Sequence, residues 1–206
     1  MWSRWWNYLL LSAHCRRRTQ VEGVNYSETF YSAAKMPTVQ VILVTAATQD
    51  WEIEHIDIKS AYLNVMLKET IYMKPPWGVL KPGEEGKVCC LVKGLYGLKQ
   101  AGCGWYQEMS QVLVKDLGFT CFAVDHSVFF RCSPDEHTII AVTTDNMAVT
   151  LKQAEDITRS KADIQCYWEI TDNGPIWWFL GFQILHDRAN NFNRSEYVHP
   201  GNGWQV

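Results

Sequence analysis

Two short apolar runs around a polar turn restrict the fold of this chain more than any other feature of its sequence. The segment TIIAVTTDNMAVT, residues 138–150, holds one acid, Asp145, between runs rich in β-branched residues. Runs of this length and composition favour strands, and the Thr-Asp-Asn turn between them favours a tight hairpin. Together with HSVFFRC at 126–132, the segment predicts an antiparallel meander with Asp145 at the tip of its last hairpin.

Helical and extended patterns alternate along the rest of the chain. Helices are expected where apolar residues recur at helical spacing, at 32–50, 104–119 and roughly 152–166. Strands are expected at 51–62, on both sides of the Pro- and Gly-rich loop 75–87, and across 176–186. This order predicts an α+β fold in which helices pack on one face of an antiparallel sheet.

Composition narrows the class of protein. A length of 206 residues with 47% hydrophobic and 20% charged residues suits one globular domain, or one and a fragment. The net charge of −3 gives no overall attraction to phosphate, so nucleic acid would need a local basic patch. Seven cysteines without a C-x-x-C pair favour a reduced intracellular setting, cytoplasmic or nuclear, over secretion. No run approaches the roughly 18 apolar residues of a membrane span, so no membrane partner is expected.

Two acids are candidates for chemistry. Asp57 ends the strand-like run EHIDI, and Asp145 lies at the predicted hairpin tip. If these strands are neighbours, both carboxylates should face one cleft and could hold a pair of Mg²⁺ ions about 4 Å apart, since this cation prefers oxygen ligands. The alternative is that Asp145 is only a turn residue that bonds its own backbone, and spacing alone does not separate the two interpretations.

Six sequence blocks then occur in a definite order, and the run LYGLKQA at 95–101 is the most specific part of them. The blocks are QVEGVNYSETFYSAAKM, IEHIDIKSAYLN, IYMKPPWG, LVKGLYGLKQAGCGWY, LGFTCFAVDHSVFF and TDNGPIWWFLGFQI. In this order they resemble the reverse transcriptase domain of copia-type LTR retrotransposons, from about Gln20 to about Tyr197.

The resemblance implies a right-hand polymerase palm with partial fingers. In that family Asp57 and Asp145 match the acids that hold two Mg²⁺ ions, and Ile58 would add a backbone carbonyl. Tyr62 and Gln100 match nucleotide-binding positions, Tyr62 beside the sugar and Gln100 near the incoming nucleotide. The implied partners are an RNA or DNA template-primer and a dNTP. Without the family pattern, Tyr62 is equally well explained as core packing and Gln100 as the start of a helix.

The resemblance also divides the chain. Residues 20–197 would form the fingers and palm fragment. Residues 1–19 would be an unrelated or disordered N-terminal tail, and residues 198–206 a C-terminal tail. The thumb of the family is expected to be missing or truncated.

Departures from the family pattern fall on the predicted site. The hairpin motif Tyr-x-Asp-Asp falls on residues 143–146, so Asn146 stands where the family has its second acid. A unit charge pair at 4 Å is worth about 4 kcal/mol at an effective dielectric near 20. Because about 1.4 kcal/mol corresponds to a tenfold change in rate, metal-dependent DNA synthesis is expected to be slower by roughly ten- to several-hundred-fold. The Asn146 side chain is expected to turn away from the cleft, or only to glance at it, because consecutive residues diverge. Gly102 and Cys103 stand where the family carries Pro and Arg.

The sequence thus indicates an RNA-directed DNA polymerase domain, a nucleotidyltransferase whose activity is impaired or absent, as in a pseudoenzyme. The alternative is a non-catalytic retrotransposon remnant. It would act at most as a nucleic-acid-binding module through Lys93 and Lys99, or as a protein-binding module through the Trp-rich N-terminus, Trp2, Trp5 and Trp6.

Overall fold

The structure is a computed structural model of the chain. It describes residues 20–75, 78, 80, 82–84, 86–133, 137–152, 154–187 and 192–197. The two expected tails, including the Trp-rich N-terminus, lie outside the described residues. The chain divides into two compact units, one formed by 1–31 and 60–109 and the other by 32–59 and 110–206.

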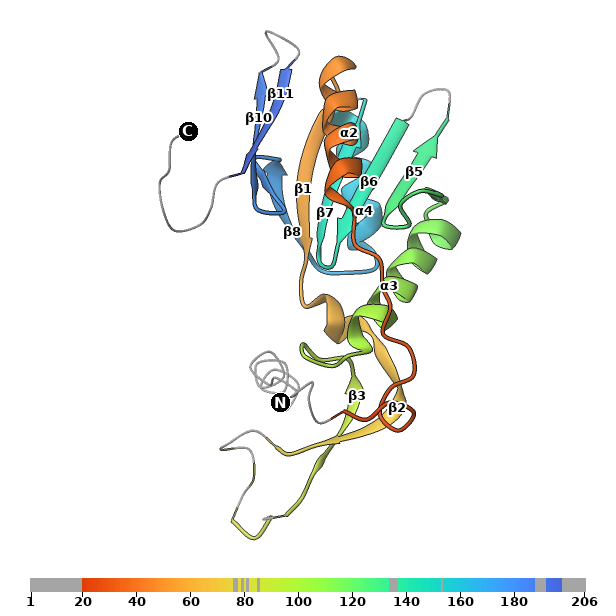
Figure 1. The fold of residues 1–206 in the computed structure, drawn as a ribbon, viewed down its shortest axis with the longest axis vertical. Helices are drawn as coiled ribbons and strands as arrows, with labels where there is room; N and C mark the ends of the chain where they lie inside the picture. Colours follow the sequence, from red (N-terminus) through yellow and green to blue (C-terminus); the bar gives the residue numbers. More distant parts are fainter. Residues whose placement is uncertain are drawn as a thin grey trace. The chain divides into compact units, whose positions relative to one another are not determined.

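The second unit is built on a six-stranded sheet in the order β4-β5-β6-β7-β1-β8, with antiparallel pairing throughout (Figure 1). Its strands are β1 Glu52–Ile58, β4 Thr120–Cys121, β5 Val128–Cys132, β6 His137–Thr143, β7 Asn146–Leu151 and β8 Ile170–Pro175. The predicted meander is confirmed, with Thr144 and Asp145 as the loop between β6 and β7. Strand β1 comes much earlier in the sequence, yet it lies between β7 and β8.

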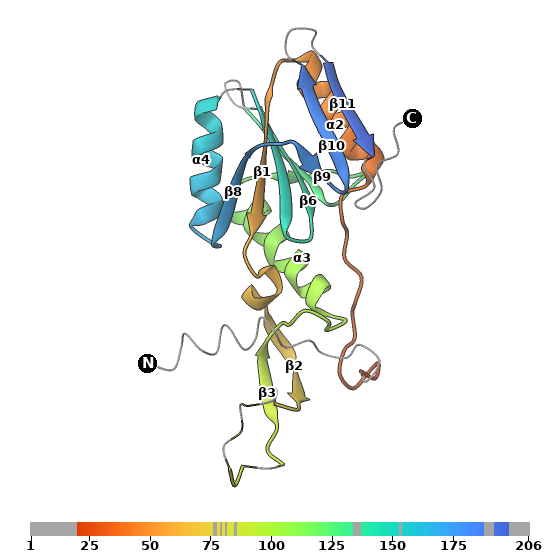
Figure 2. The ribbon, with the colours of Figure 1, turned by 90° about the vertical axis from the view of Figure 1, so that its left-hand side faces the viewer.

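Two helices cover this sheet, one on each face (Figure 2): α2 Met36–Thr48 and α4 Ala154–Gln165. Helix α2 packs in a core cluster with Ile53 of β1. On α4, Lys161 donates to Glu54, the next residue of β1, and to Asp172 of β8 at 2.6 Å. Ile53 and Glu54 are adjacent in β1 and point to opposite faces of the sheet, so α2 and α4 cover opposite faces. The expectation that helices pack on one face is therefore wrong.

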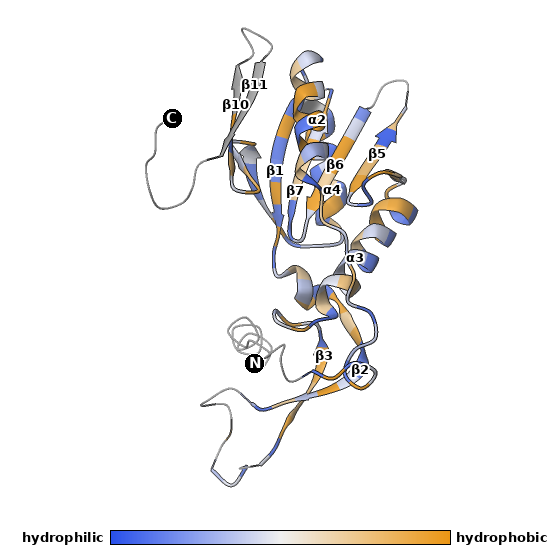
Figure 3. Cartoon of the chain, viewed as in Figure 1, coloured by the Kyte–Doolittle hydropathy of each residue, from blue (hydrophilic) through white to orange (hydrophobic). Residues whose placement is uncertain are grey.

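The physical reason is that the central strands are apolar on both faces. In β6 and β7, Ile140 and Val149 point to one side while Ala141 and Ala148 point to the other, and all four are at most 2% exposed. Figure 3 shows hydrophobic residues along β6 and α2. A sheet with two apolar faces must be covered on both. None of the described helices is both long and apolar enough to cross a membrane.

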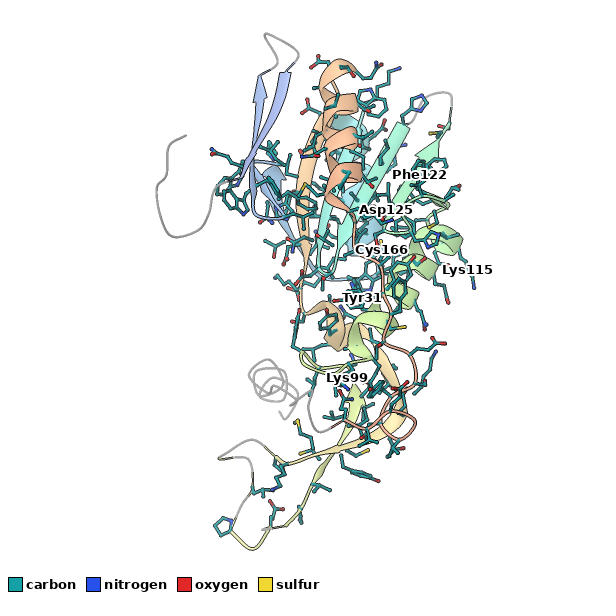
Figure 4. All side chains as sticks on the ribbon, viewed as in Figure 1. Tyr31, Lys99, Lys115, Phe122, Asp125 and Cys166 are labelled. Atoms are coloured by element: carbon teal, nitrogen blue, oxygen red, sulfur yellow. The ribbon has the colours of Figure 1, made fainter. Side chains whose placement is uncertain are left out.

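A buried carboxylate fixes the start of α2. Asp125, 1% exposed and labelled in Figure 4, accepts a hydrogen bond from the backbone N–H of Lys35 at 2.8 Å. Its other oxygen accepts from the N–H of Ser127 at 3.2 Å. Lys35 is the N-cap residue of α2, and its own side chain makes no cap hydrogen bond. Asp125 therefore satisfies a backbone donor at the beginning of the helix and joins α2 to the loop before β5.

A second, three-stranded sheet follows α4 and has the order β11-β10-β9. Its strands are β9 Trp178–Phe179, β10 Phe182–Asp187 and β11 Phe192–Tyr197. The expected strands across 176–186 are confirmed here. Strand β8, with the sequence ITDNGP, was not expected, because its polar residues, Gly and Pro are typical of a turn. It is an edge strand of the sheet, and edge strands tolerate such residues.

The first unit holds a long hairpin and a helix. Its elements are the 3₁₀ helix η2 Ala61–Asn64, β2 Met66–Met73, β3 Cys89–Lys93 and the start of α3 Ala101–Gln111. A π-helical turn, η3 Val112–Asp116, continues α3 into the second unit, and the left-handed Gly118 (φ +72°) follows it, as the sequence predicted.

Gly102 has a packing role in the first unit. A Cβ atom on Gly102 would lie 2.5 Å from the Tyr31 ring, which Figure 4 labels. The Pro of the family pattern would require this ring to move. The departure at Gly102 is therefore accommodated by the position of Tyr31.

Leu43 tests the packing of α2. Leu43 is 5% exposed in the core cluster, whereas its neighbour Val44 is 57% exposed. We expect Leu43→Ala to lower the free energy of unfolding by about 2–5 kcal/mol, because it leaves a cavity. Val44→Ala, on the outer face of the same helix, should change it by less than about 0.5 kcal/mol. Urea unfolding of both variants measures this, and equal losses would contradict the packing described.

Candidate functional site

Strand pairing brings Asp57 to the tip of the β6–β7 hairpin. Asp57 pairs with Asn146 at the end of the β1–β7 ladder. One residue further, the N–H of Ile58 donates to the carbonyl oxygen of Asp145 at 2.7 Å. The two acids that the sequence singled out are thus next to each other in one unit, although the chain between them is long.

The hairpin tip has an unusual backbone. Thr144, between Thr143 and Asp145, has a φ of +55°, in the left-handed region. β-branched residues rarely adopt this conformation, and it costs of order 1–3 kcal/mol. The surrounding ladder must therefore hold the tip in place, as is common at functional sites.

The negative charge of Asp145 acts on the carboxyl group of Asp57. The pKa of Asp57 is raised above its usual 3.8, first by burial and then by the negative charge of Asp145, while the nearby His55 lowers it. Among the residues that the structure describes, neither carboxylate forms a salt bridge. A bound cation would relieve this repulsion, so the electrostatics favour a metal over a further anion.

Asn146 does not turn away from the acids, so the first of the two expected orientations of its side chain is wrong. Its amide nitrogen donates to Oδ1 of Asp145 at 2.9 Å. Its Oδ1 lies 2.7 Å from Nε2 of His55, which therefore carries the proton and donates. Asn146 is the ladder partner of Asp57, so the two side chains share a sheet face with His55. The alternation argument failed because Asp145 lies in the loop, outside the strand.

The donor set fits a hard divalent cation only in part. Mg²⁺ in proteins commonly uses one or two carboxylates and completes its shell with water and phosphate. Asp57 and Asp145 supply such a pair, and Ile58 follows Asp57 directly. Within the described ranges, however, no group of three or more His, Cys, Asp and Glu side chains could hold a metal. The Asn146 amide also occupies one oxygen of Asp145.

Tyr62 and Gln100 belong to the first unit and have partners there. The Tyr62 ring lies 4.6 Å from that of Tyr96 and packs on the core of the unit. Gln100 is 7% exposed. Its oxygen accepts from Gln20 at 2.9 Å, and its nitrogen donates to the carbonyl of Asn25 at 2.8 Å. Nucleotide contacts of Tyr62 and Gln100 stay predictions, and for Gln100 they would require it to exchange hydrogen bonds.

Lys99 is also held in place. Its ammonium donates to the Tyr26 hydroxyl at 2.9 Å and lies 4.4 Å from the centre of that ring. A cation fixed in this way is a preorganised contact for a phosphate, but part of its hydrogen-bonding capacity is already used.

Sequence reasoning missed His55. It lies two residues before Asp57, and this spacing places both side chains on one face of a strand. The two-residue spacing in a predicted strand could therefore have identified His55 as a neighbour of Asp57. Its hydrogen bond to Asn146 depends on the β1–β7 register, which the sequence did not reveal.

Comparison with known proteins connects this geometry to a family. The sequence profile described as "Reverse transcriptase (RNA-dependent DNA polymerase)" matches residues 14–199. The chain is 32% identical over 182 residues to the retrovirus-related Pol polyprotein from transposon TNT 1-94 of Nicotiana tabacum. It is 28% identical over 164 residues to that from transposon RE1 of Arabidopsis thaliana, and 32% identical over 135 residues to the putative transposon Ty5-1 protein of Saccharomyces cerevisiae.

These matches cover most of this chain but a small part of its relatives. They cover 87%, 80% and 66% of the chain, and 14%, 11% and 43% of the tobacco, Arabidopsis and yeast proteins respectively. No solved structure matches the chain.

The raised pKa of Asp57 predicts a stability effect that depends on pH. Well below pH 3.8 the Asp57 carboxyl is protonated in both the folded and the unfolded state, so its ionisation does not affect the stability of the fold. As pH rises past that value the unfolded chain ionises first, so the folded state loses stability until Asp57 itself ionises. Asp57→Asn should therefore raise the melting temperature at neutral pH, without added metal, more than at about pH 3.

Asp116→Asn removes a carboxylate at an exposed position of the same unit and serves as the control. Thermal melts of both variants at the two pH values make the comparison. A destabilised Asp57→Asn variant at neutral pH would show that the Asp57 carboxylate is compensated by a partner.

Proposed function

This chain belongs to the reverse transcriptase (RNA-dependent DNA polymerase) family of copia-type transposon Pol polyproteins, and from that membership we propose that its second unit is a polymerase palm with an impaired metal site. The fingers part would come from the first unit. The chain spans only 14% of the tobacco relative. That this chain has the DNA-synthesising activity of the family is therefore also part of the proposal.

The observation that carries the proposal is that Asp57 and Asp145 lie next to each other, so that the negative charge of one acts on the other. Asp57 pairs with the residue after Asp145, and the Asp145 charge raises the pKa of Asp57. In template-directed synthesis the primer 3′-oxygen bonds to the α-phosphorus of a dNTP, the bond to pyrophosphate breaks, and the 3′-hydroxyl proton is lost. Asp57, Asp145 and the Ile58 carbonyl would hold Mg²⁺ ions, which supply positive charge at the entering and leaving oxygens.

Asn146 accounts for the proposed impairment in two ways. It lacks the negative charge of the second family acid, which lowers the attraction for a divalent cation. It also donates its amide N–H to Oδ1 of Asp145 at 2.9 Å, so that oxygen is less available to a metal. We therefore propose that Mg²⁺ binding is weak and that DNA synthesis is slow or absent.

A second candidate function is a non-catalytic remnant that binds nucleic acid. It is favoured by two hydrogen bonds, from His55 to Asn146 and from Asn146 to Asp145. Together they fix the position of the Asp145 carboxylate without a metal. The Gln100 amide also favours the remnant, because both its oxygen and its nitrogen already form hydrogen bonds within the chain. Such a module would contact phosphate through exposed Lys93 and through Lys99.

Restoring the missing acid tests the proposed palm. Asn146→Asp adds one negative charge beside Asp57 and removes the amide donor to Asp145, so we expect Mg²⁺ affinity to rise about tenfold or more. Asp57→Asn in that background should abolish the gain. Isothermal titration calorimetry measures both, and Asn25→Asp, which adds the same charge in the first unit, is the matched control.

Primer extension separates the two candidate functions. With Mg²⁺ and then Mn²⁺ on an RNA template, the chain as it stands should extend a primer weakly or not at all, and Asn146→Asp should increase extension at least about tenfold. If Mg²⁺ affinity is unchanged by Asn146→Asp and by Asp57→Asn, the palm proposal fails and the remnant is favoured.

A further inference from the structure

We propose that the free edge of β3 in the first unit pairs with β3 of a second copy of this chain. The two β2–β3 hairpins then form one four-stranded antiparallel sheet, related by a twofold axis at Cys90. This pairing involves neither the acids of the second unit nor the proposed polymerase function.

The β2–β3 hairpin has one covered face and one open face. Ile71 of β2 and Leu91 of β3 are cross-strand partners, and both are buried in a core cluster of the unit. Tyr72 pairs with Cys90, so these two side chains lie on the opposite face. Tyr72 is 64% exposed, and Cys90 is exposed as well. A two-stranded sheet is only marginally stable in water, so a further strand would stabilise it.

An apolar stripe follows β3 on the open face. Alternate residues of a strand share a face, so Val92 lies on the same side as Cys90 and is 61% exposed. Val88, directly before the strand, is 56% exposed. Residues 88–92, with the sequence VCCLV, carry no charge, Pro or Gly. Apolar segments of this kind on an exposed strand edge pair readily with other strands.

The edge of β3 that faces away from β2 is available for pairing. Among the strands that the structure describes, β3 pairs only with β2. The backbone N–H and C=O groups on its other edge can therefore hydrogen-bond a further strand. A nucleic acid strand is a poor fit to this edge, because the stripe itself carries no Lys or Arg for phosphate.

A second copy of β3 suits this edge because the stripe is self-complementary. Antiparallel pairing centred on Cys90 places the two Cys90 side chains opposite each other and Val88 opposite Val92 of the second copy. Each such pair brings apolar or thiol groups together and leaves no charge opposite a charge within residues 88–92. The same strand thus supplies both halves of the interface, as a twofold axis requires.

Charges at the ends and at the far edge of the hairpin limit the assembly to two copies. The register places Lys87 opposite Lys93 of the second copy, but Lys87 forms an ion pair with Glu84 at 2.9 Å, which reduces the repulsion. On the far edge, β2 carries Lys68, and its register with β3 shifts along the strand. A charged and irregular edge resists further pairing, so the assembly closes as a dimer.

Sedimentation equilibrium of the full chain under reducing conditions measures the pairing. The interface is small, so we expect a dissociation constant on the order of 0.1 mM. Val92→Lys places a charge in the stripe and should weaken the dimer at least about tenfold. Val41→Lys makes the same change at a position of α2 that is 65% exposed, in the second unit, and should leave the constant unchanged.

The thiol of Cys90 reports the register. Directly opposite residues of an antiparallel pair are close enough for a disulfide. Diamide should therefore join Cys90 of two copies: each thiol loses one hydrogen, the two sulfurs bond, and diamide is reduced to its hydrazine. Cys90→Ser should abolish this cross-linked dimer, whereas Cys132→Ser, which removes another exposed thiol, should not. Mass spectrometry of the digested dimer identifies the joined peptides.

Several results would overturn the proposal. One is a chain that stays monomeric at about 1 mM, and another is equal weakening by Val92→Lys and Val41→Lys. A cross-link that survives Cys90→Ser would exclude the register centred on Cys90. If Val92→Lys instead changes the affinity of a monomeric chain for a short RNA–DNA duplex, the stripe is a nucleic-acid surface and the proposal fails. Asp57→Asn separates this proposal from the palm, since it should abolish Mg²⁺ binding while leaving the dimer unchanged.

Discussion

The antiparallel pairing of β1 with β7 is the constraint on which the candidate site depends. This register puts Asp57 opposite Asn146 and directs the N–H of Ile58 to the carbonyl of Asp145 at 2.7 Å. A shift of one residue would move Asp57 to the opposite face of the sheet and separate it from the hairpin acid. A shift would also change which side chains lie opposite each other, such as Ile140 with Val149 and Ala141 with Ala148, and so disturb the packing of both buried faces. Core packing and site geometry are therefore specified by the same ladder.

The asparagine at the hairpin tip changes the chemistry while preserving the fold. An amide can donate as well as accept, so Asn146 links Asp145 to His55, which a carboxylate could not do in the same way. Relative to the family acid, Asn146 removes charge from the proposed metal site and adds a hydrogen-bonded connection to His55. The His55 ring is thus linked to Asp145 through Asn146, and its other nitrogen lies 3.4 Å from the Asn173 amide at the β8 bulge.

Much of the fold could be predicted because its signals are local. The hairpin around Asp145, the helix ending before Gly118 and the strand carrying Asp57 all follow from periodicity, turn residues and glycine conformation. The unpredicted features are non-local. Strand β8 is a polar edge strand whose pairing compensates for weak propensity, and the covering of both sheet faces depends on which elements meet. Neither is visible in a window of neighbouring residues.

The sequence by itself determined the family, the strand that carries Asp57 and the place of Asp145 at a turn, because short motifs and turn chemistry are encoded by adjacent residues. Only the tertiary structure decided that Asn146 faces the acids, that His55 donates to it, and that a bulge brings Asn173 to the His55 ring. These contacts depend on strand register and on a positive φ at Gly174, which arise when distant segments pair. A hydrogen bond between residues 55 and 146 forms only once the sheet has brought their strands together.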